Sequence, residues 1–495
     1  MLYMRMFFLM TISLYTSRAI LEALGIENYG IYNVVGSVLI LFSFLTSALS
    51  SSTRRYLNYW LGRNNEEALK KVFSICFSIH TIIAIIIVLL GETIGLWLVN
   101  NVLNLPTDRM YAANWVYQIT ILSAVVGILS VPFESAIVAK EKLSVYAYIS
   151  IFEAILKLVM VFLLFHSPFD VLIYYAILIF VVTNIVTVFK FFYCLKKFDF
   201  CQPRIIFSKA ESREVGSFTG WSLFGQLSYV GSTTGVNMII NVFLGVSINA
   251  AVGIANQVNN IVYNFVSNFQ TSFNPQLIQT YSSNNMSEHR LLISRASRIS
   301  LYLLILISVP VILNVDFLLN LWLTEVPEYS PQFLTAILWA SVIEAYGAPL
   351  WMSMQAIGKI RNYQITVSII NALIIPYSFF ALFLGYSPVW IFKFKIIINI
   401  ILLIYRIVYI LPKIQQSRQR FLVDNVLRSA IIMISAFLIT RLFACWIINP
   451  WPKLIITTMV SIGLIFGLVY CFGLTREEKV YVKRKIIDFR LKILT

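Results

Sequence analysis

The sequence predicts an all-helical protein that crosses a membrane many times. Of its 495 residues, 59% are hydrophobic and only 12% are charged, whereas soluble domains carry about 25% charged residues. Apolar stretches such as 81–90 are continuous, whereas the strands of outer-membrane barrels alternate polar and apolar residues. These observations exclude a soluble enzyme and a membrane barrel, and they favour a polytopic helical bundle.

The apolar runs, taken in order along the chain, predict fourteen transmembrane helices. About 20 apolar residues suffice to cross the hydrocarbon core, and polar turns separate runs of this length. The predicted spans are 3–24, 28–53, 72–99, 111–138, 144–165, 169–192, 216–244, 249–275, 299–323, 332–357, 363–384, 388–411, 426–448 and 454–473. No connecting segment reaches the roughly 50 residues of an independent domain, so function is expected among the helices.

The basic residues predict the orientation of these spans, because lysine and arginine stay on the cytoplasmic side during insertion. Thirty of the 38 basic residues lie in alternate loops and at the two ends, and only Arg109 and Lys453 lie in the opposite loops. We therefore expect both termini in the cytoplasm. Most of the net charge of +16 then reflects topology rather than binding to nucleic acid. The basic tail 474–495 is expected to be an amphipathic helix on the anionic inner leaflet.

An internal repeat divides the chain into two halves. Landmarks recur after 217 to 225 residues: Leu24-Gly25 and Leu244-Gly245; Leu96-Trp97-Leu98 and Leu321-Trp322-Leu323; Pro132, Ala139, Lys142 and Pro349, Ala356, Lys359; Ser167-Pro168 and Ser387-Pro388. The pattern predicts a six-helix lobe (1–195), a cytoplasmic linker (196–214), a second six-helix lobe (215–412), two accessory helices (413–473) and the basic tail. Two parallel repeats that face a central cavity are typical of alternating-access transporters.

Sequence motifs give no sign of an enzyme. The five cysteines form no C-x-x-C pair and the three histidines lie far apart, so neither a metal site nor a disulfide framework is expected. No G-x-x-x-x-G-K-[ST] loop occurs, which argues against nucleotide hydrolysis. We predict no catalytic residue and no cofactor.

Two stretches of the chain resemble a known family. They are Tyr15-Thr16-Ser17-Arg18 with Leu24-Gly25, Tyr29-Gly30 and 32–36, and Ala255-Asn256-Gln257 through Asn274-Pro275 to Tyr281. Both are similar to polysaccharide-type flippases of the MATE-like MOP superfamily, which include Wzx-type O-antigen and capsule flippases. The chain differs from them at its start, where Met1 almost begins the first span and they carry a short cytoplasmic lead.

The resemblance implies a function and a location. Such a protein moves a polyprenyl-pyrophosphate-linked oligosaccharide from the inner to the outer leaflet of the bacterial inner membrane. The implied partners are this lipid-linked oligosaccharide, membrane lipids, and a polysaccharide polymerase with its chain-length machinery. We expect a monomer. The resemblance does not specify the sugar.

Several cations within the spans are candidate ligands for the pyrophosphate. A charged side chain at the membrane centre costs about 2.5–3.5 kcal/mol on insertion scales, so it must snorkel, pair or face water. Arg18 and Lys157 lie deepest, and each has an acid one turn away, Glu22 and Glu153 respectively. They form either neutral pairs within a helix or cavity cations that bind phosphate oxygens, which the arginine fork suits well.

Four further cations are candidates with an alternative explanation. Arg54 and Arg55 close the second predicted span at its cytoplasmic end, as headgroup ligands or as ordinary orienting residues. Lys393 and Lys395 are two residues apart and therefore about 200° apart around a helix. At most one of these lysines is expected to face a central cavity.

Amides are expected to bind the sugar. The eighth predicted span carries asparagines at intervals of four residues: Asn256, Asn260, Asn264 and Asn268. Gln257 and Asn259 extend this stripe, and Asn237 and Asn241 of the preceding span are further candidates. Because asparagine in lipid leaves its amide unsatisfied, the stripe faces either another helix, as polar glue, or a wet cavity that presents donors and acceptors to hydroxyls.

Four acids are candidates for ion coupling: Glu22, Glu92, Asp316 and Glu344. An acid within a span is a functional candidate, and an ion pair inside the bundle is the alternative explanation.

Two other functions stay open. A membrane polymerase or ligase for the same lipid-linked sugars would need catalytic groups outside the bilayer, where the chain offers little: Asp108, Arg109, Asp170, Glu325 and Glu328. A multidrug or cation antiporter of the same superfamily would need an acidic cavity, against which Arg18 and Lys157 argue.

Overall fold

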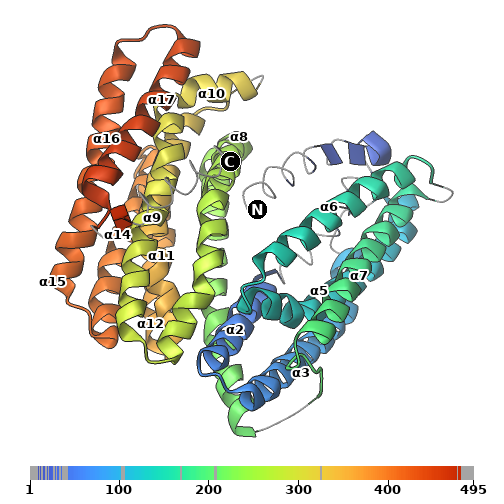
Figure 1. Ribbon diagram of the computed structural model, residues 1–495. Helices are drawn as coiled ribbons and strands as arrows, with labels where there is room; N and C mark the ends of the chain where they lie inside the picture. The colour runs from blue at the N-terminus through green and yellow to red at the C-terminus, as the bar shows by residue number, and fades with distance from the viewer. Residues whose placement is uncertain are drawn as a thin grey trace, which may run out of the picture. The chain divides into compact units, whose positions relative to one another are not determined.

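The computed structural model is helical throughout the part of the chain that it describes. It describes residues 43–101, 106–167, 170–205, 209–323, 326–475 and 478–480, and before them residues 9, 12, 15–16, 19–20, 22–25, 28, 31–32 and 35. No strand occurs among these residues. The predicted all-α membrane fold is therefore confirmed (Figure 1).

Sixteen helices follow one another along the described chain. They are α2 (Ser43–Gly62), α3 (Glu66–Leu90), α4 (Leu96–Asn101), α5 (Met110–Ala139), α6 (Leu143–Leu164), α7 (Val171–Lys197), α8 (Lys209–Ser282), α9 (Met286–Leu313), α10 (Val315–Trp322), α11 (Ser330–Ile357), α12 (Arg361–Ala372), α13 (Ile374–Phe383), α14 (Val389–Ile410), α15 (Arg418–Phe421), α16 (Arg428–Cys445) and α17 (Pro450–Leu468). Wider π-helical turns at Gly91–Gly95, Leu422–Leu427 and Val469–Gly473 join or extend some of them.

Eleven helical stretches of the described chain are long and apolar enough to cross a membrane. They correspond to eleven of the predicted spans. More than half of the predicted span 3–24 and part of 28–53, including 36–42, lie outside the described residues. The predicted span 249–275 is helical, but its many amides keep it out of the apolar set.

The repeat landmarks adopt matching local structure where they are described. Gly25 and Gly245 have φ angles of 72° and 80°, a left-handed conformation that glycine adopts without steric cost. The break at Gly245 divides α8 into two helical segments, 209–244 and 246–282, at the predicted turn. Pro132 and Pro349 lie inside α5 and α11.

The chain forms two compact units. The first comprises Met1–Val230, Ile278–Asn284 and Gln355–Ile365, and the second comprises Gly231–Leu277, Asn285–Met354 and Thr366–Thr495. The first unit therefore includes two short segments from the second half of the sequence.

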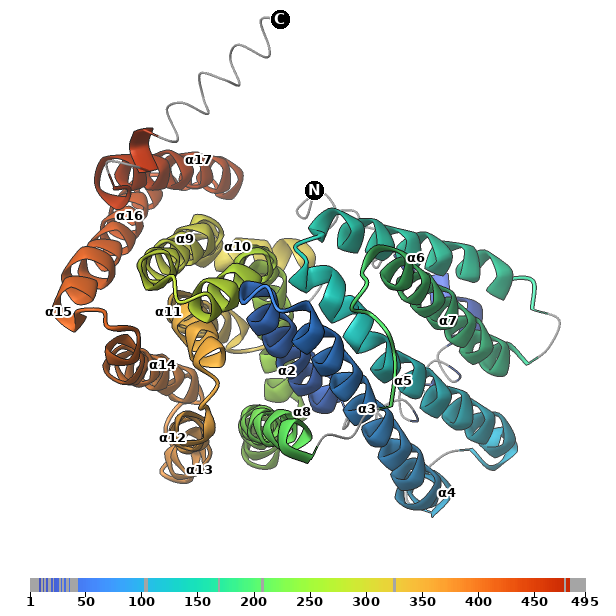
Figure 2. The ribbon, with the colours of Figure 1, turned by 60° about the horizontal axis from the view of Figure 1, so that its bottom comes forward.

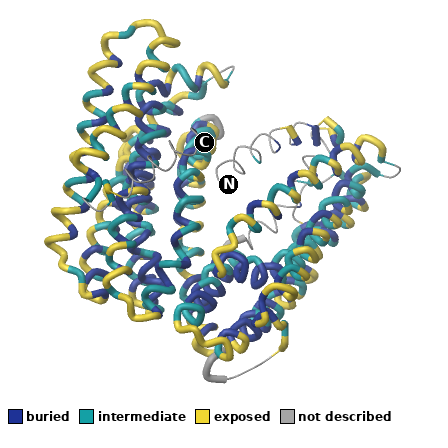
Figure 3. The backbone as a smooth tube through the Cα atoms, in the orientation of Figure 1, coloured by how far each residue is buried: buried dark blue, intermediate teal, exposed yellow. Residues whose placement is uncertain are grey.

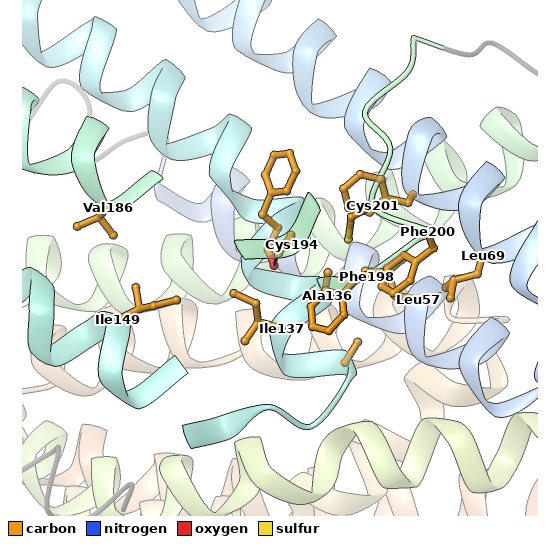
Figure 4. Close-up of a cluster of buried hydrophobic side chains, with 13 residues drawn as sticks. Leu57, Leu69, Ala136, Ile137, Ile149, Val186, Cys194, Phe198, Phe200 and Cys201 are labelled. Atoms are coloured by element: carbon orange, nitrogen blue, oxygen red, sulfur yellow. Dashed lines mark hydrogen bonds between the residues drawn. The ribbon is translucent and has the colours of Figure 1, made fainter. Parts of the chain in front are cut away.

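In the first unit, α5 packs against α2, α3 and α7 (Figure 2). Figure 3 shows the resulting core as a run of buried residues along these helices. Part of this core is an aromatic-rich cluster that includes Phe73, Phe133, Phe198 and Phe200 (Figure 4). It fixes the mutual positions of α2, α5 and α7, from which the candidate site below is built.

In the second unit, α9 packs against α16 and α17, and α13 packs against α14. Helix α11 is buried over most of its length.

Candidate functional site

Most membrane helices of this chain expose apolar side chains, as contact with lipid requires. Helices α6, α14 and α16 each carry a stripe of exposed large residues, for example Phe162, Ile404 and Leu438. Helix α2 and the 246–282 segment of α8 differ. Among their described side chains, no large hydrophobic one is exposed. Their open faces are polar instead, which identifies them as the candidate functional surfaces.

The open face of the α8 segment consists of small and amide residues. Its exposed positions follow helical spacing: Ala250, Gly253, Gln257, Asn260 and Asn264. Asn256 and Asn268 flank this face and are half-buried. The side chains of Asn256, Asn260 and Asn264 form no hydrogen bond with another described residue, while Asn268 Nδ2 donates to the carbonyl of Asn264 over 2.8 Å. At membrane depth, such free amides need water or a polar ligand.

Other amides of the same segment hold helices together. Asn259 Oδ1 accepts a hydrogen bond of 2.8 Å from Ser341 Oγ of α11. Buried Gln270 donates from Nε2 to Ser300 Oγ and to the carbonyl of Ala345, both over 3.2 Å. The two explanations of the amide stripe thus apply to different residues, with helix contacts on the buried side and unpaired amides on the open side.

The open face of α2 combines serine with arginine. Ser47 is exposed, and Ser50, Ser51 and Arg54 are half-buried at spacings that place them on one side of the helix. Leu49, Leu57 and their neighbours on the other side belong to the core of the first unit.

Arg54 belongs to a three-residue charge cluster within the first unit. Its Nη2 lies 3.4 Å from Glu134 Oε1 of α5, and Lys190 Nζ of α7 lies 2.8 Å from Glu134 Oε2. Two cations share one carboxylate, so the cluster carries a net charge of +1. The Arg54 and Lys190 side chains keep 24% and 12% of their surface exposed, which leaves room for an anionic ligand. Lys190 was not predicted as a site residue, because a lysine at the cytoplasmic end of a span is normally explained by the positive-inside rule.

Arg55 points away from this face. It is only 5% exposed, its Nε donates to the carbonyl of Gln355 over 2.8 Å, and its guanidinium lies over the rings of Tyr56 and Phe218.

Lys157 is paired with Glu153 on α6 across 2.7 Å, as its spacing predicted. Phe152, Ile155 and Val159 define the exposed apolar stripe of this helix, and Lys157 lies about 180° from the centre of that stripe. The Lys157 side chain nevertheless keeps 49% of its surface exposed. Its pair is therefore open to a ligand on the side of α6 that faces away from the apolar stripe.

Lys393 and Lys395 lie on opposite sides of α14. Lys393 shares the exposed apolar stripe with Ile397 and Ile404, and its Nζ lies 4.4 Å from the centroid of the Trp390 ring. This is the arrangement of a snorkelling residue. Lys395 is half-buried on the other side, together with Asn399, which donates to the carbonyl of Ala340 over 2.8 Å. Only Lys395 is placed toward the interior of the second unit.

The remaining candidates have varied surroundings. Arg18 lies outside the described residues, and Glu22 is exposed. Exposed Glu92 accepts a hydrogen bond of 3.0 Å from Gln118 Nε2. Asp316 is exposed in the short helix α10, Asn237 is half-buried, and Asn241 is exposed beside Val242 and Phe243.

Glu344 stands out among the predicted acids. It is half-buried within α11 and has no ion pair or hydrogen bond with another residue that the structure describes. Within the same limits, no group of three His, Cys, Asp or Glu side chains is placed to hold a metal ion.

Two residues of the predicted outer loops form a clamp. Arg109 donates to both carboxylate oxygens of Asp170, over 2.7 and 3.2 Å, and to Asn28 Oδ1 over 2.6 Å. Asp170 also accepts from the backbone amides of Leu172 and Ile173 at the start of α7. Partial burial raises the pKa of Asp170, but the bonds from Arg109 and the two amides outweigh it and hold this pKa below its usual value. Arg109 and Asp170 thus tie helix ends together.

Comparisons with known proteins define the fold class. No protein-family model and no curated protein matches the sequence. Solved structures do match, among them transporters of the MATE family and of the wider MOP superfamily. The chain therefore has the MOP transporter fold.

Three of these structures illustrate the match. A MOP superfamily transporter from Pyrococcus furiosus, for which a reversed polarity of the binding pocket suggests a different function, is 15% identical with a TM-score of 0.67 over 84% of this chain and 94% of that one. An outward-facing multidrug resistance MATE transporter is 14% identical with a TM-score of 0.68 over 84% and 94%. A MATE protein in a bent conformation is 16% identical with a TM-score of 0.69 over 83% and 93%.

Proposed function

We propose that the protein is a flippase that moves a polyprenyl-pyrophosphate-linked oligosaccharide from the inner to the outer leaflet of a bacterial inner membrane. One observation carries this proposal. Whereas membrane helices such as α6, α14 and α16 expose apolar stripes, α2 and the 246–282 segment of α8 have polar open faces; that of α2 includes cations, and that of the α8 segment is lined by amides. A membrane protein retains such faces only where they meet water or a polar ligand.

The chemistry of the two faces matches the two parts of this substrate. Arg54 and Lys190 offer a net positive charge to the pyrophosphate, and arginine binds phosphate oxygens through two parallel donors. Asn260 and Asn264 offer donors and acceptors to sugar hydroxyls without selecting for charge. The polyprenyl tail stays in the lipid.

The proposed cycle needs no chemistry on the substrate. The pyrophosphate arrives at the Arg54 cluster from the cytoplasmic leaflet and competes with Glu134 for the two cations. Arg18 and Lys157 are proposed as companion cations along the path. Rearrangement of the two proposed six-helix repeats then exposes the lipid-linked oligosaccharide to the outer side of the membrane. A polymerase and its chain-length machinery would use the product outside.

A second candidate function is a multidrug or cation antiporter of the same superfamily. The MATE neighbours and Glu344, a half-buried acid without a described partner, favour it. It needs acids on the open faces, whereas α2 and the 246–282 segment carry no acid, and the one acid beside Arg54, Glu134 of α5, is neutralised by two cations. Glu344 is equally suited to proton or sodium coupling of a flippase.

Complementation separates these candidates. The gene is expressed in bacteria that lack a repeat-unit flippase and, separately, in bacteria that lack their main drug exporters. Restored surface polysaccharide without added drug resistance supports the flippase. Drug resistance that disappears in Glu344→Gln, with no polysaccharide, supports the antiporter. Arg18→Glu, with its membrane level checked, tests the cation whose position is not described.

A further inference from the structure

Two segments from the C-terminal half of the sequence contact helix α2 between Ser51 and Gly62. Residues 278–284 comprise the end of α8 and the start of the turn after it, and residues 355–365 comprise the end of α11, the turn 358–360 and the start of α12. Both belong to the first compact unit. The positive-inside pattern places both segments, like the end of α2, on the cytoplasmic side.

Arg55 fastens the 355–365 segment. Its Nε donates to the carbonyl of Gln355 over 2.8 Å, and Gln355 Nε2 in turn donates to Ser51 Oγ over 2.7 Å. Gly358 lies directly against the guanidinium of Arg55, where any β-carbon would collide with Nη2. Its φ of +84° also favours glycine. The sequence at this turn is therefore adapted to receive the arginine.

Gln279 and Ser282 fasten the 278–284 segment. Gln279 Nε2 donates to Asn58 Oδ1 over 3.2 Å and to the carbonyl of Ala139 over 3.1 Å. Gly62 faces Ser282 and the backbone of Gln279 so closely that a β-carbon would collide with them. Both segments thus approach α2 at glycines.

The contacts between α2 and these two segments are weak enough to break and re-form. The polar contacts between α2 and these segments are hydrogen bonds, and each neutral hydrogen bond contributes only about 0.5–1.5 kcal/mol net. Arg55 Nη1 is buried without a hydrogen bond to any described residue, a situation that water relieves when the contact separates. By contrast, α2 also packs against α3 and α5 through a buried apolar cluster that includes Leu57, Leu69 and Phe133.

We propose that Arg55, Gln355, Gly358, Asn58 and Gln279 form a cytoplasmic latch. With the latch closed, as in this structure, the two segments block access from the cytoplasm along α2; transport requires them to leave α2 and return in each cycle. Arg55 is then a positioning residue and not a substrate ligand, unlike its neighbour Arg54. The inference rests on the proposed transport function.

Cross-linking tests the latch in the full chain. In a background in which the five cysteines are replaced, Ser51→Cys with Gln355→Cys should cross-link in membrane vesicles under mild oxidation. The cross-link should abolish restored polysaccharide, and reduction should return it. The control pair, Asn100→Cys with Asn114→Cys, joins two side chains that hydrogen-bond within the first lobe over 3.1 Å. Its cross-link should leave transport unchanged.

Gly358→Ala gives a readout that needs no substrate. The new methyl group collides with Arg55, so cross-linking of the Ser51→Cys and Gln355→Cys pair should slow about tenfold, as expected for loss of a hydrogen bond from a charged donor. Gly385→Ala is the matched control, because Gly385 has a similar φ of +77° but open space around it. It should cross-link at the parent rate.

Three results would overturn the latch: a latch pair that does not cross-link, a cross-linked protein that transports at full rate, or a Gly358→Ala protein that cross-links like its parent. If the wild-type chain restores no polysaccharide, the proposed function fails, and the Gly358→Ala comparison still decides whether the latch exists.

Discussion

Helix α2 and the 246–282 segment of α8 both present polar open faces, yet these faces differ in charge. The face of α2 ends in Arg54, within a cluster that also holds Lys190 and Glu134. The face of the α8 segment presents Gln257, Asn260 and Asn264 and no charge. Under the proposed function, this difference corresponds to a division of roles, in which α2 binds an anionic group and the α8 segment binds neutral polar groups.

The cost of charge in a membrane explains why only one face needs a counter-ion. A cation at membrane depth costs several kcal/mol unless it is paired or hydrated. In the proposed cycle, Glu134 keeps Arg54 and Lys190 paired between substrates, and the pyrophosphate replaces this carboxylate. Amides carry no such cost once water reaches them, so they can stay unpaired on an open face. The predictions below test this division, from the largest expected effect to the smallest.

Charge reversal at Arg54 should have the largest effect. Arg54→Glu places a second carboxylate beside Glu134, so that Lys190 alone faces two acids and the pyrophosphate is repelled. Disrupting a part-buried charge pair costs about 2–5 kcal/mol, so transport in the complementation assay should fall about 100-fold or more. Arg63→Glu, in the exposed turn after α2, is the matched control and should retain transport. Equal losses in both variants, at normal protein levels, would remove Arg54 from the binding site.

Removal of charge at Lys190 should have a smaller effect. Lys190→Gln leaves Arg54 and Glu134 as a neutral pair, and we expect about a tenfold loss of transport from the loss of one charge-assisted contact. Lys393→Gln, on the exposed apolar stripe of α14, should transport normally. The account of the cluster is wrong if Lys393→Gln is the more damaging of the two.

Single asparagine replacements should distinguish the open face from the buried side of the α8 segment. Asn260→Ala removes one neutral hydrogen bond to the sugar and should weaken transport about two- to tenfold, with unchanged thermal stability. Asn259→Ala removes the bond with Ser341 and should lower the melting temperature instead. A lower melting temperature for Asn260→Ala, with normal transport, would indicate that the open face has a structural role only.

The outer clamp should affect stability alone. Because the pKa of Asp170 in the folded protein lies below its usual 3.8, its contribution is complete above that pH and is lost as the pH falls through the folded-state pKa. Arg109→Gln should therefore lower the melting temperature of the purified protein by a few degrees at pH 7. This difference from the parent should shrink as the pH falls below 3.8 toward the folded-state pKa. A difference that stays constant down to pH 2 would contradict the ionic clamp.

Much of the fold could be predicted from local sequence alone. Apolar runs specify membrane helices because the bilayer thickness fixes their length, and Leu244-Gly245 marks the break in α8 because glycine adopts positive φ readily. The asparagine spacing also places Asn260 and Asn264 on one helix face. These features depend on neighbours within a few turns.

The charge cluster and the latch could not be predicted in this way. Arg54 and Glu134 are 80 residues apart, and Arg55 and Gln355 are 300 residues apart. Which of two adjacent arginines faces the open side depends on how α2 packs against α5 and the 355–365 segment. Lys190 has the sequence context of an orienting lysine and gains its role only through Glu134.

Flipping in reconstituted vesicles tests the central claim most directly. Purified protein is placed in liposomes with a fluorescent polyprenyl-pyrophosphate oligosaccharide, and a membrane-impermeant reagent measures the fraction that has reached the outer leaflet. We predict that the wild-type protein moves this lipid, that Arg54→Glu does not, and that Arg63→Glu behaves like wild type. A protein that leaves the lipid in place, yet takes up a cationic drug in the same vesicles in exchange for protons or sodium ions, would contradict the account.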